Sequence, residues 1–379
     1  MPVDFELREL LRTIIRKASD AEQIHRLAKR IRDWDSVLLL AWEHRILPML
    51  YSRLAGSGSA VPLIVQERLR TEYERNLFHN MANAAELLAV LKAFEDESIP
   101  AMPFKGVVLG AVAYHDLTAR TAGDLDILIH IHDLIRAMTI LVERGYERIT
   151  AANVDGTPIP GCYEYRFERQ VDGMVLELRW RLALTEPRYG RNLGLDWVWS
   201  RRRTATLAGA EVPDIDPELT LFILCMHGSR HFWSRLLWIC DVAQLIESSP
   251  ELDWEEIISE AKKQGLWRSL ALGVLFAHRI VGATVAQSVL WRFESDAVAC
   301  KVAQHIEDHL FDVPGSSPPG FVPYNFQLLD FNDRVRAILS FDFLKPNDRD
   351  RAALSLPKPL HFLYYLIRPF RLLSDRSAR

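Results

Sequence analysis

The organisation of this chain is clearest in the stretch FKGVVLGAVAYHDLTARTAGDLDILI, residues 104–129. Prolines end the helical pattern that precedes it, so residues 101–104 are compatible with a short strand. The apolar pattern then predicts a helix over 107–115 and a strand over 124–130. A chain that passes from strand to helix to strand in this way is typical of an α/β or α+β core.

Two aspartates in this stretch are candidate metal ligands. Asp124 and Asp126 are two positions apart in a leucine- and isoleucine-rich strand, so both carboxylates project from the same face and can share one cation. Mg2+ prefers hard oxygen ligands and usually keeps phosphate oxygens of the substrate in its shell. The alternative is a solvated strand end, because an Asp-x-Asp pair by itself is weak evidence.

The residues before the aspartates are suited to a phosphate. Lys105 and Gly106 follow the short strand and open the helix, where backbone N–H groups and the positive end of the helix attract an anion. Arg120 lies four residues before Asp124 and can pair either with a phosphate or with that aspartate. The sequence leaves both partners open.

The chain before residue 99 has the periodicity of helices. Its clearest apolar stripe repeats at alternating steps of three and four residues and is expected to face a core. The stripe consists of Leu69, Tyr73, Leu77, Met81, Ala84, Leu88 and Leu91.

After the aspartates, the pattern predicts a helix over 132–144 and a strand over 146–150. The segments CYEYRFERQ and MVLELRW then alternate and are separated by a turn with an Asp-Gly pair, which predicts a hairpin. Glu177 lies on its second strand. It completes an acidic triad only if that strand lies beside the strand of the aspartates, and otherwise it is a surface carboxylate paired with Arg179 or Arg166.

We therefore expect an α+β fold with a small mixed β-sheet core over residues 99–185. An N-terminal helical region, 1–98, and a helical domain, 186–312, flank that core. Residues 313–379 are expected to form a linker and a mostly helical C-terminal extension, because prolines and glycines gather over 313–323.

A polar stripe is predicted within the helical domain. At about 100° per residue, its members fall on one face of a single helix; they are His227, His231, Arg235, Trp238 and Asp241. Such a stripe needs partners. Three roles remain open: structural packing, lining of a substrate cleft, and metal ligation through the two histidines, for which no third ligand is apparent.

The composition limits the function classes. The 379 residues are 49% hydrophobic and 25% charged, as in a globular protein with a sizeable core. Lys and Arg number 46 against 50 Asp and Glu, so the net charge of -4 supplies no general attraction for nucleic acid. The four cysteines form no CxxC pair, and neither a signal peptide nor a membrane-spanning stretch is apparent. We expect a cytoplasmic protein, for which a protein partner is possible.

The stretch over residues 104–129 resembles the signature of the uncharacterised nucleotidyltransferases of the polymerase-beta-like superfamily. In these proteins a Lys-Gly, a Tyr, an Arg and a DxD recur in this order. The matching residues are Lys105, Gly106, Tyr114, Arg120, Asp124 and Asp126.

The resemblance continues over roughly residues 35–250, including CMHGSRHFWSRLLWICDVAQL. In LELRW, the family usually has an acidic residue followed two positions later by His and then Trp. This chain has Glu177, Arg179 and Trp180 there, so Arg179 is a departure. Another departure from the superfamily is Gly106-Val107 in place of a Gly followed by Gly or Ser.

The resemblance implies a metal-dependent nucleotidyltransferase. Asp124, Asp126 and Glu177 would hold Mg2+ or Mn2+ and carry catalysis. A nucleoside triphosphate would donate the nucleotidyl group to a hydroxyl or phosphate of a small-molecule or peptide acceptor. The residues expected to contact the nucleotide are Lys105, Gly106, Arg120, His227, His231 and Arg235. The alternatives are a nucleotide-binding regulatory or interaction protein with little turnover, and a toxin-neutralising transferase that modifies another protein.

Overall fold

The structure is a computed structural model. The described residues are 5–18, 20–55, 60–150, 162–182 and 195–311, with the single positions 158, 324, 328 and 360 and the segment 363–365. Apart from the positions after residue 311 in that list, the expected linker and C-terminal extension lie outside the described residues.

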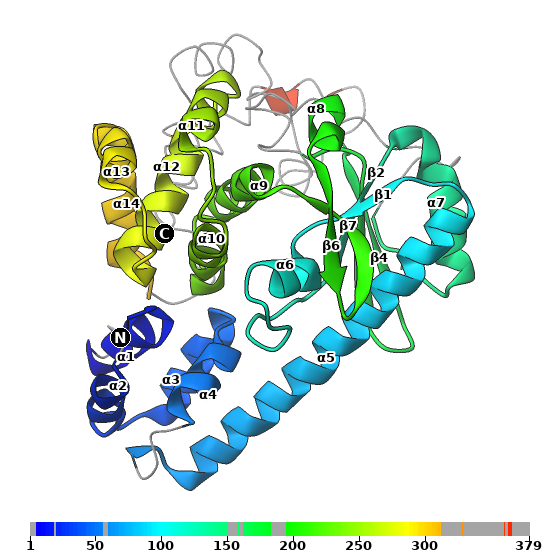
Figure 1. Cartoon of the computed structure of the whole chain (residues 1–379). Coiled ribbons are helices and arrows are strands. Elements are labelled where there is room, and N and C mark those ends of the chain that lie inside the picture. Colours follow the sequence, from blue (N-terminus) through cyan, green and yellow to red (C-terminus); the bar gives the residue numbers. More distant parts are fainter. Residues whose placement is uncertain are drawn as a thin grey trace.

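Residues before the sheet form helices, as the periodicity predicts. These helices are α1 (Phe5–Ile15), α2 (Ala21–Ala28), α3 (Trp34–Glu43), α4 (Leu47–Leu54) and α5 (Leu63–Asp96). The first four bury leucine and isoleucine faces against one another. Helix α5 has 34 residues and runs from this bundle to the sheet (Figure 1).

The sheet has the strand order β1-β2-β5-β4-β3 within the described part of the chain. Its strands are β1 (Ala101–Pro103), β2 (Leu125–Ile129), β3 (Glu147–Arg148), β4 (Glu164–Arg169) and β5 (Met174–Arg179). Strands β2 and β5 are parallel and the other neighbours are antiparallel. The predicted α+β fold with a small mixed sheet is therefore confirmed.

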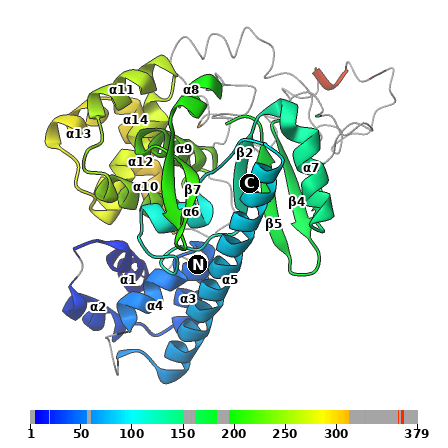
Figure 2. The same cartoon turned by 45° about the vertical axis from the view of Figure 1, so that its right-hand side comes forward.

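The helices predicted around β2 are also present. Helix α6 (Gly106–Val112) follows β1, and α7 (Leu134–Glu143) follows β2 after a short 3-10 turn, Ile131–Asp133. Helices α7 and α5 lie on one side of the sheet, whereas α6 and the C-terminal helices lie on the other (Figure 2). Leu125, Ile127 and Ile129 pack into the core on the α5–α7 side.

The segment after the sheet differs from the predicted all-helical domain. Helix α8 (Leu195–Ser200) is followed by a hairpin of β6 (Arg202–Leu207) and β7 (Ala210–Ile215). Ala208 and Gly209 both have positive φ, as a two-residue hairpin turn requires. The strands are rich in small and charged residues, so their apolar signal is weak. The hairpin is nevertheless partly buried, because it packs against α6 and β1, and its local sequence does not indicate this.

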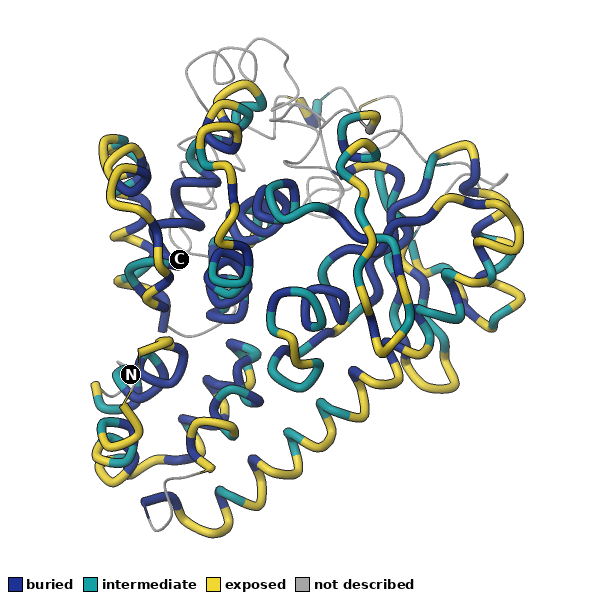
Figure 3. Tube along the Cα trace, in the orientation of Figure 1, coloured by how far each residue is buried: buried dark blue, intermediate teal, exposed yellow. Residues whose placement is uncertain are grey.

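Helices form the remainder of the described chain. They are α9 (Pro217–Arg230), α10 (Leu236–Ser248), α11 (Trp254–Lys263), α12 (Trp267–Phe276), a π-helical turn (Ala277–Val281), α13 (Gln287–Glu294) and α14 (Ala297–His309). Helices α9, α10 and α12 are the most deeply buried of them (Figure 3). No helix in the described ranges is both long and apolar enough to cross a bilayer.

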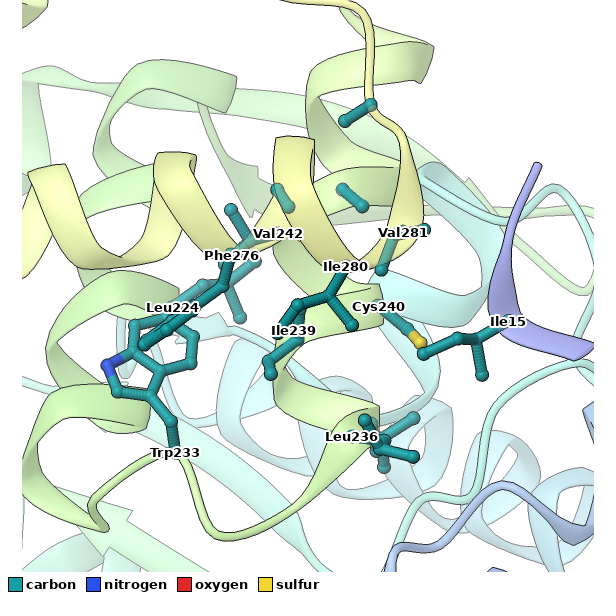
Figure 4. Packing of buried hydrophobic residues seen from close by; sticks show 14 of the residues in the cluster. Ile15, Leu224, Trp233, Leu236, Ile239, Cys240, Val242, Phe276, Ile280 and Val281 are labelled. Carbon is teal, nitrogen blue, oxygen red and sulfur yellow. The ribbon is translucent and has the colours of Figure 1, made fainter. Parts of the chain in front are cut away.

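The predicted single helix through residues 227–241 is wrong, because α9 ends at Arg230 and α10 begins at Leu236. Between them Trp233 has a φ of 52° and turns back onto α9, where its backbone N–H donates a hydrogen bond to the carbonyl of Gly228 at 2.8 Å. A Cβ on Gly228 would lie 2.5 Å from the indole ring. The indole is fully buried beside Phe276 (Figure 4), so the burial of one large side chain breaks the helix.

The predicted stripe of α5 is wrong in its middle. Met81 is 54% exposed, whereas Asn80 and Asn83 are buried. Asn80 Nδ2 donates to the carbonyl of Arg120 at 2.7 Å, and Asn83 Nδ2 donates to that of Ala122 at 3.3 Å. The loop between α6 and β2 carries carbonyl groups that need donors, so this part of α5 buries amides instead of hydrocarbon.

A buried ion pair holds the same loop from the opposite side. Arg120 Nε lies 2.8 Å from Asp241 Oδ1, and Nη2 lies 3.0 Å from Oδ2. The Tyr114 hydroxyl donates to Asp241 Oδ1 at 2.9 Å, and Arg120 Nη1 donates to the carbonyl of Gly106 at 3.2 Å. Asp241 is 1% exposed. The pair therefore connects the loop, the start of α6 and helix α10.

His44 makes a second connection, between the N-terminal helices and α10. Its Nδ1 accepts a hydrogen bond from the N–H of Leu236 at 3.3 Å, and its carbonyl accepts one from Leu237 at 3.2 Å. Burial, with a smaller contribution from Arg235, lowers the pKa of His44 to about 4. The ring is therefore neutral at pH 7, as its acceptor role requires.

Replacing Arg120 with Met should lower the free energy of unfolding by about 3–5 kcal/mol, because Asp241 would stay buried without a counterion. Urea denaturation measures this change. The double variant Arg120→Met with Asp241→Leu should recover part of the loss. The control Arg70→Met removes an exposed pair with Glu74 and should change the free energy of unfolding little. A loss in Arg120→Met no larger than in the control would contradict the role of the buried pair.

Acid should destabilise the fold through His44. The unfolded side chain titrates near 6.5 and the folded one near 4, so only the unfolded state gains a proton as pH falls between these values. The expected contribution is about 2 kcal/mol of stability lost by pH 5 relative to pH 7. His44→Gln keeps an acceptor that does not titrate and should reduce the difference between urea denaturation at pH 7 and pH 5. His79→Gln, at an exposed histidine, should leave this difference unchanged. An equal loss of stability between pH 7 and pH 5 in both variants would show that His44 is not its source.

Candidate functional site

An acidic face lies on the side of the sheet opposite α5 and α7. Asp124 directly precedes β2, and Asp126 lies within it. In the parallel pairing of β2 with β5, Asp126 is opposite Glu177. The neighbours of these residues along both strands point into the core on the other side, so the three carboxylates belong to one face of two adjacent strands.

Arg179 lies among these carboxylates. Its Nε is 3.1 Å from Asp126 Oδ1 and its Nη1 is 2.7 Å from Glu164 Oε2, while Nη2 also contacts Glu177. The side chain is 12% exposed. Burial alone would lower its pKa, but Asp126, Glu164 and Glu177 outweigh burial and raise it. A permanent cation therefore lies among three carboxylates, at the position where the resemblance led us to expect His.

Asp124 carries the negative charge that Arg179 does not neutralise. Burial first, and then the charges of Asp126 and Glu177, raise the pKa of Asp124 to about 6. A cation beside this carboxylate would relieve both effects. The oxygen donors of Asp124 and Asp126 thus fit a hard divalent ion such as Mg2+.

The predicted metal triad is not preformed. No group of three or more His, Cys, Asp or Glu side chains in the described ranges is arranged to bind one metal ion. Glu177 does lie on the expected strand and face, but Arg179 bridges it to Asp126. Contacts with a nearby arginine were the alternative for Glu177, and Arg166 Nη1 is also 3.7 Å from its Oε1.

Lys105 points its ammonium group at the acidic face. Its Nζ is 3.8 Å from Asp126 Oδ2 and 3.4 Å from His227 Nδ1. The backbone there has a φ of 58°, which is unfavourable for a residue with a Cβ, and Gly106 follows with a φ of 49°. A Cβ on Gly106 would lie 3.1 Å from the carbonyl oxygen of Asp124. The Lys-Gly pair thus forms a tight turn against the end of the loop between α6 and β2, residues 113–124, which we call the aspartate loop.

The partner of Arg120 is neither of the two that the sequence left open. Arg120 pairs with neither Asp124 nor an exposed phosphate site, because Asp241 binds its guanidinium bidentately. Asp241 lies on a different element, 121 residues later in the chain, and no local pattern links the two. Arg120 positions the start of α6 and the aspartate loop from within the protein.

The two histidines of the predicted stripe stay together although α9 ends between them, at Arg230. The ring centroids of His227 and His231 are 4.7 Å apart, and each is 5.2 Å from that of Trp238. Burial first, and then Lys105, lower the pKa of His227 well below 6.5. The neutral His227 ring can accept a hydrogen bond from Lys105, and no third metal ligand joins the pair among the described residues.

Arg235 lines a cavity beside Asp124, and its guanidinium carbon lies 5.3 Å from the ring centroid of Trp238, which also packs against both histidines. The cavity has a volume of about 680 Å3 and is bordered by α3, α4, α5, the residues before β2 and the turn before α10. Arg45 lies in the same cavity and has a φ of 56°. A Cβ on Gly123 would come within 2.7 Å of Arg45 Nη1. Sequence reasoning missed Arg45, which belongs to no motif and whose neighbours come from distant segments.

The arginine pair of the cavity is electrostatically linked to Asp124. Burial lowers the pKa of Arg45, and Asp124 opposes that shift. Burial and then Arg45 lower the pKa of Arg235, and again Asp124 opposes the shift. The first aspartate of the DxD pair therefore stands between an acidic face and a basic cavity.

The chain is similar in part to two solved structures. One is the lincosamide antibiotic adenylyltransferase LnuA with lincomycin bound, at 15% identity over 42% of this chain and 94% of that one, with a TM-score of 0.31. The other is an antigenic nucleotidyltransferase-like protein from Paracoccidioides brasiliensis, at 14% identity over 55% of this chain and 96% of that one, with a TM-score of 0.29. No curated protein matches the chain.

The family comparison covers the sheet and most of the helices around the site. The model of the family described as uncharacterised nucleotidyltransferase matches residues 31–282, which include both aspartates, Lys105 and Asp241. Because the match extends over more than half of the chain, this protein belongs to the uncharacterised nucleotidyltransferase family.

Proposed function

We propose that the protein transfers a nucleotidyl group from a nucleoside triphosphate to a hydroxyl or phosphate of a small-molecule or peptide acceptor. The observation that carries the proposal is the acidic face itself. Asp124 and Asp126 share one side of a buried strand, and Lys105 Nζ lies 3.8 Å from Asp126. Two carboxylates beside a fixed ammonium group suit a substrate that arrives as a polyphosphate with a divalent cation.

Asp124 and Asp126 would hold Mg2+ or Mn2+, which polarises the α-phosphate and neutralises charge on the leaving pyrophosphate. Lys105 supplies a second positive charge next to Asp126, and its tight turn restricts where that charge can lie. The hydrogen bond that His227 can accept helps to orient the ammonium group. The ion pair of Arg120 with Asp241 keeps the start of α6 and the aspartate loop in register.

Arg179 gives this site a different charge balance from one with His at that position. Its guanidinium neutralises part of the charge of Asp126 and Glu177. We propose that Glu177 serves mainly to hold Arg179, and that the divalent ion depends chiefly on the two aspartates. A divalent ion that binds Asp126 through Oδ1 must compete with Arg179 for that oxygen atom.

A second function is favoured by the same arginine. If Arg179 keeps its contacts with Asp126 and Glu177 when nucleotide binds, the protein would bind a nucleoside triphosphate without efficient transfer. It would then act as a regulatory or interaction protein with the nucleotidyltransferase fold. Pyrophosphate release from each of the four nucleoside triphosphates, with Mg2+ or Mn2+ and host extract as a source of acceptor, separates the two functions.

Asp126→Asn should abolish pyrophosphate release, because the amide keeps the shape of the side chain but binds Mg2+ weakly. The melting temperature without ligand should stay close to that of wild type, since the lost contact with Arg179 is offset by less repulsion from Asp124. The rise in melting temperature on adding Mg2+ and nucleotide should shrink. Asp96→Asn, at an exposed carboxylate of α5, should behave like wild type. An Asp126→Asn variant with normal pyrophosphate release would remove the main support for the proposal.

Arg179→Met should bind Mn2+ about tenfold more tightly than wild type, a gain of about 1.4 kcal/mol, because a competing cation is removed from Asp126. Electron paramagnetic resonance of free Mn2+ measures the dissociation constant without reference to turnover. The control Arg166→Met removes a half-exposed arginine that also approaches Glu177 and should change the constant less than twofold. Equal Mn2+ affinity in wild type and Arg179→Met would show that the guanidinium does not compete with the metal.

A further inference from the structure

The cavity beside Asp124 contains two arginines whose guanidinium groups feel the charge of Asp124 without forming an ion pair, and that of Arg235 also lies over the ring of Trp238. No ion pair or side-chain hydrogen bond of the Arg45 or Arg235 guanidinium is present among the described residues. The remaining arginine of the cavity, Arg75, is paired with Glu72 on the same helix at 2.5 Å. Two partly buried cations close to each other repel, so both would gain from an anion between them.

We propose that this cavity is the acceptor pocket and that it recognises a small molecule or peptide through one phosphate or carboxylate group bound by Arg45 and Arg235. The proposal rests on the proposed function, because it assigns the acceptor of the same site. The cavity of about 680 Å3 is of the size that holds a small ligand. Guanidinium groups are well suited to phosphate and carboxylate because they donate two parallel hydrogen bonds.

The position of the cavity relative to Asp124 favours the acceptor. Gly123 both lines the cavity and directly precedes Asp124, and it is exposed. Because it has no Cβ, Arg45 can lie across it. An acceptor held by the two arginines can therefore extend past Gly123 to the acidic face. Lys105 lies by that face at Asp126, and it does not line the cavity.

The charge of the cavity argues against the triphosphate as its occupant. Besides Arg45 and Arg235, the lining contains Glu43, which has no ion pair in the described chain, so the unpaired charge of the lining is close to that of one cation, and Asp124 beside the cavity offsets part of it. A triphosphate carries several negative charges, whereas an acceptor with one anionic group matches this balance. Trp42, Leu47 and Pro48 add apolar surface for the body of such a molecule.

Transfer to an acceptor in this pocket would form one bond to phosphorus and break one. An acceptor oxygen near Asp124 forms a bond to the α-phosphorus, and the bond from that phosphorus to the bridging oxygen breaks. Pyrophosphate leaves with the bonding electron pair. If the acceptor oxygen is a hydroxyl, its proton passes to solvent; if it is a phosphate oxygen, no proton is released.

The test compares three probes that share a carbon skeleton and differ in charge: glycerol 3-phosphate, glycerate and neutral glycerol. Isothermal titration calorimetry at pH 7.5 with the full chain measures their dissociation constants. Wild type should bind glycerol 3-phosphate or glycerate, or both, at least about tenfold more tightly than glycerol. The preferred probe identifies the anionic group as phosphate or carboxylate. Equal affinity for all three, or no binding of either anion, would overturn the proposal.

Variants then locate the binding. Arg45→Met and Arg235→Met should each weaken the preferred anion about tenfold, while the affinity for ATP with Mg2+ changes less than twofold. Arg75→Met removes a paired arginine of the same cavity and should leave the anion constant nearly unchanged. Equal losses in all three variants would indicate general attraction and contradict specific recognition. Loss of ATP affinity in Arg45→Met and Arg235→Met would place the triphosphate in the cavity and refute the acceptor assignment.

Competition separates failure of this proposal from failure of the proposed function. With host extract as acceptor, the preferred anion should raise the apparent KM for acceptor and leave that for nucleoside triphosphate unchanged. If the anion instead raises the apparent KM for nucleoside triphosphate and leaves that for acceptor unchanged, the acceptor assignment is wrong, although the protein still transfers a nucleotidyl group. If wild type releases no pyrophosphate under any condition, the proposed function fails and the cavity is not an acceptor pocket, whereas the binding constants still decide whether it is an anion site.

Discussion

The arrangement of the site depends on one buried ion pair. The chain between α6 and β2 has little regular structure, yet it must deliver Asp124 to the start of β2. Arg120 leaves this loop to reach Asp241 on α10 and, with the same guanidinium, the carbonyl of Gly106. A buried pair of this kind is costly to desolvate, but the hydroxyl of Tyr114 and the two parallel bonds to the carboxylate satisfy its polar atoms. Asparagines of α5 hold the opposite side of the loop, so its path is determined by polar contacts on both sides.

Once the loop is held, the charges around Asp124 follow a clear order. On one side Asp126 and Glu177 share Arg179, and Lys105 approaches Asp126. On the other side Arg45 and an arginine from the turn before α10 line a cavity. In the proposed function a nucleoside triphosphate and an anionic acceptor both need cations, and the cations lie at two separate places, Lys105 by Asp126 and the two arginines in the cavity. The tight turn at Trp233 contributes here, because it follows the end of α9 and the next two residues, Ser234 and Arg235, line the cavity.

Arg179 gives the acidic face a permanent positive charge. An arginine is always charged, whereas a buried histidine, the residue that the resemblance led us to expect, can be neutral. Glu164 on β4 contributes an oxygen to the same guanidinium, which places an additional carboxylate in the network. The energetic consequence is that the arginine and the carboxylates are coupled, and removal of any one changes the charge felt by the others.

The amino-acid sequence by itself determined the strand, helix, strand and hairpin around the DxD pair, the common face of Asp124 and Asp126, and the family. These features depend on local periodicity and on residues close together in the chain. Only the tertiary structure decided that Arg120 pairs with Asp241, that Trp233 divides the predicted stripe, that α5 buries Asn80 instead of Met81, and that Arg45 enters the site. Each of these outcomes depends on what a side chain meets across the fold, where burial and unpaired charge set the free energy. The spacing of residues along the chain does not indicate which distant residue a side chain will contact.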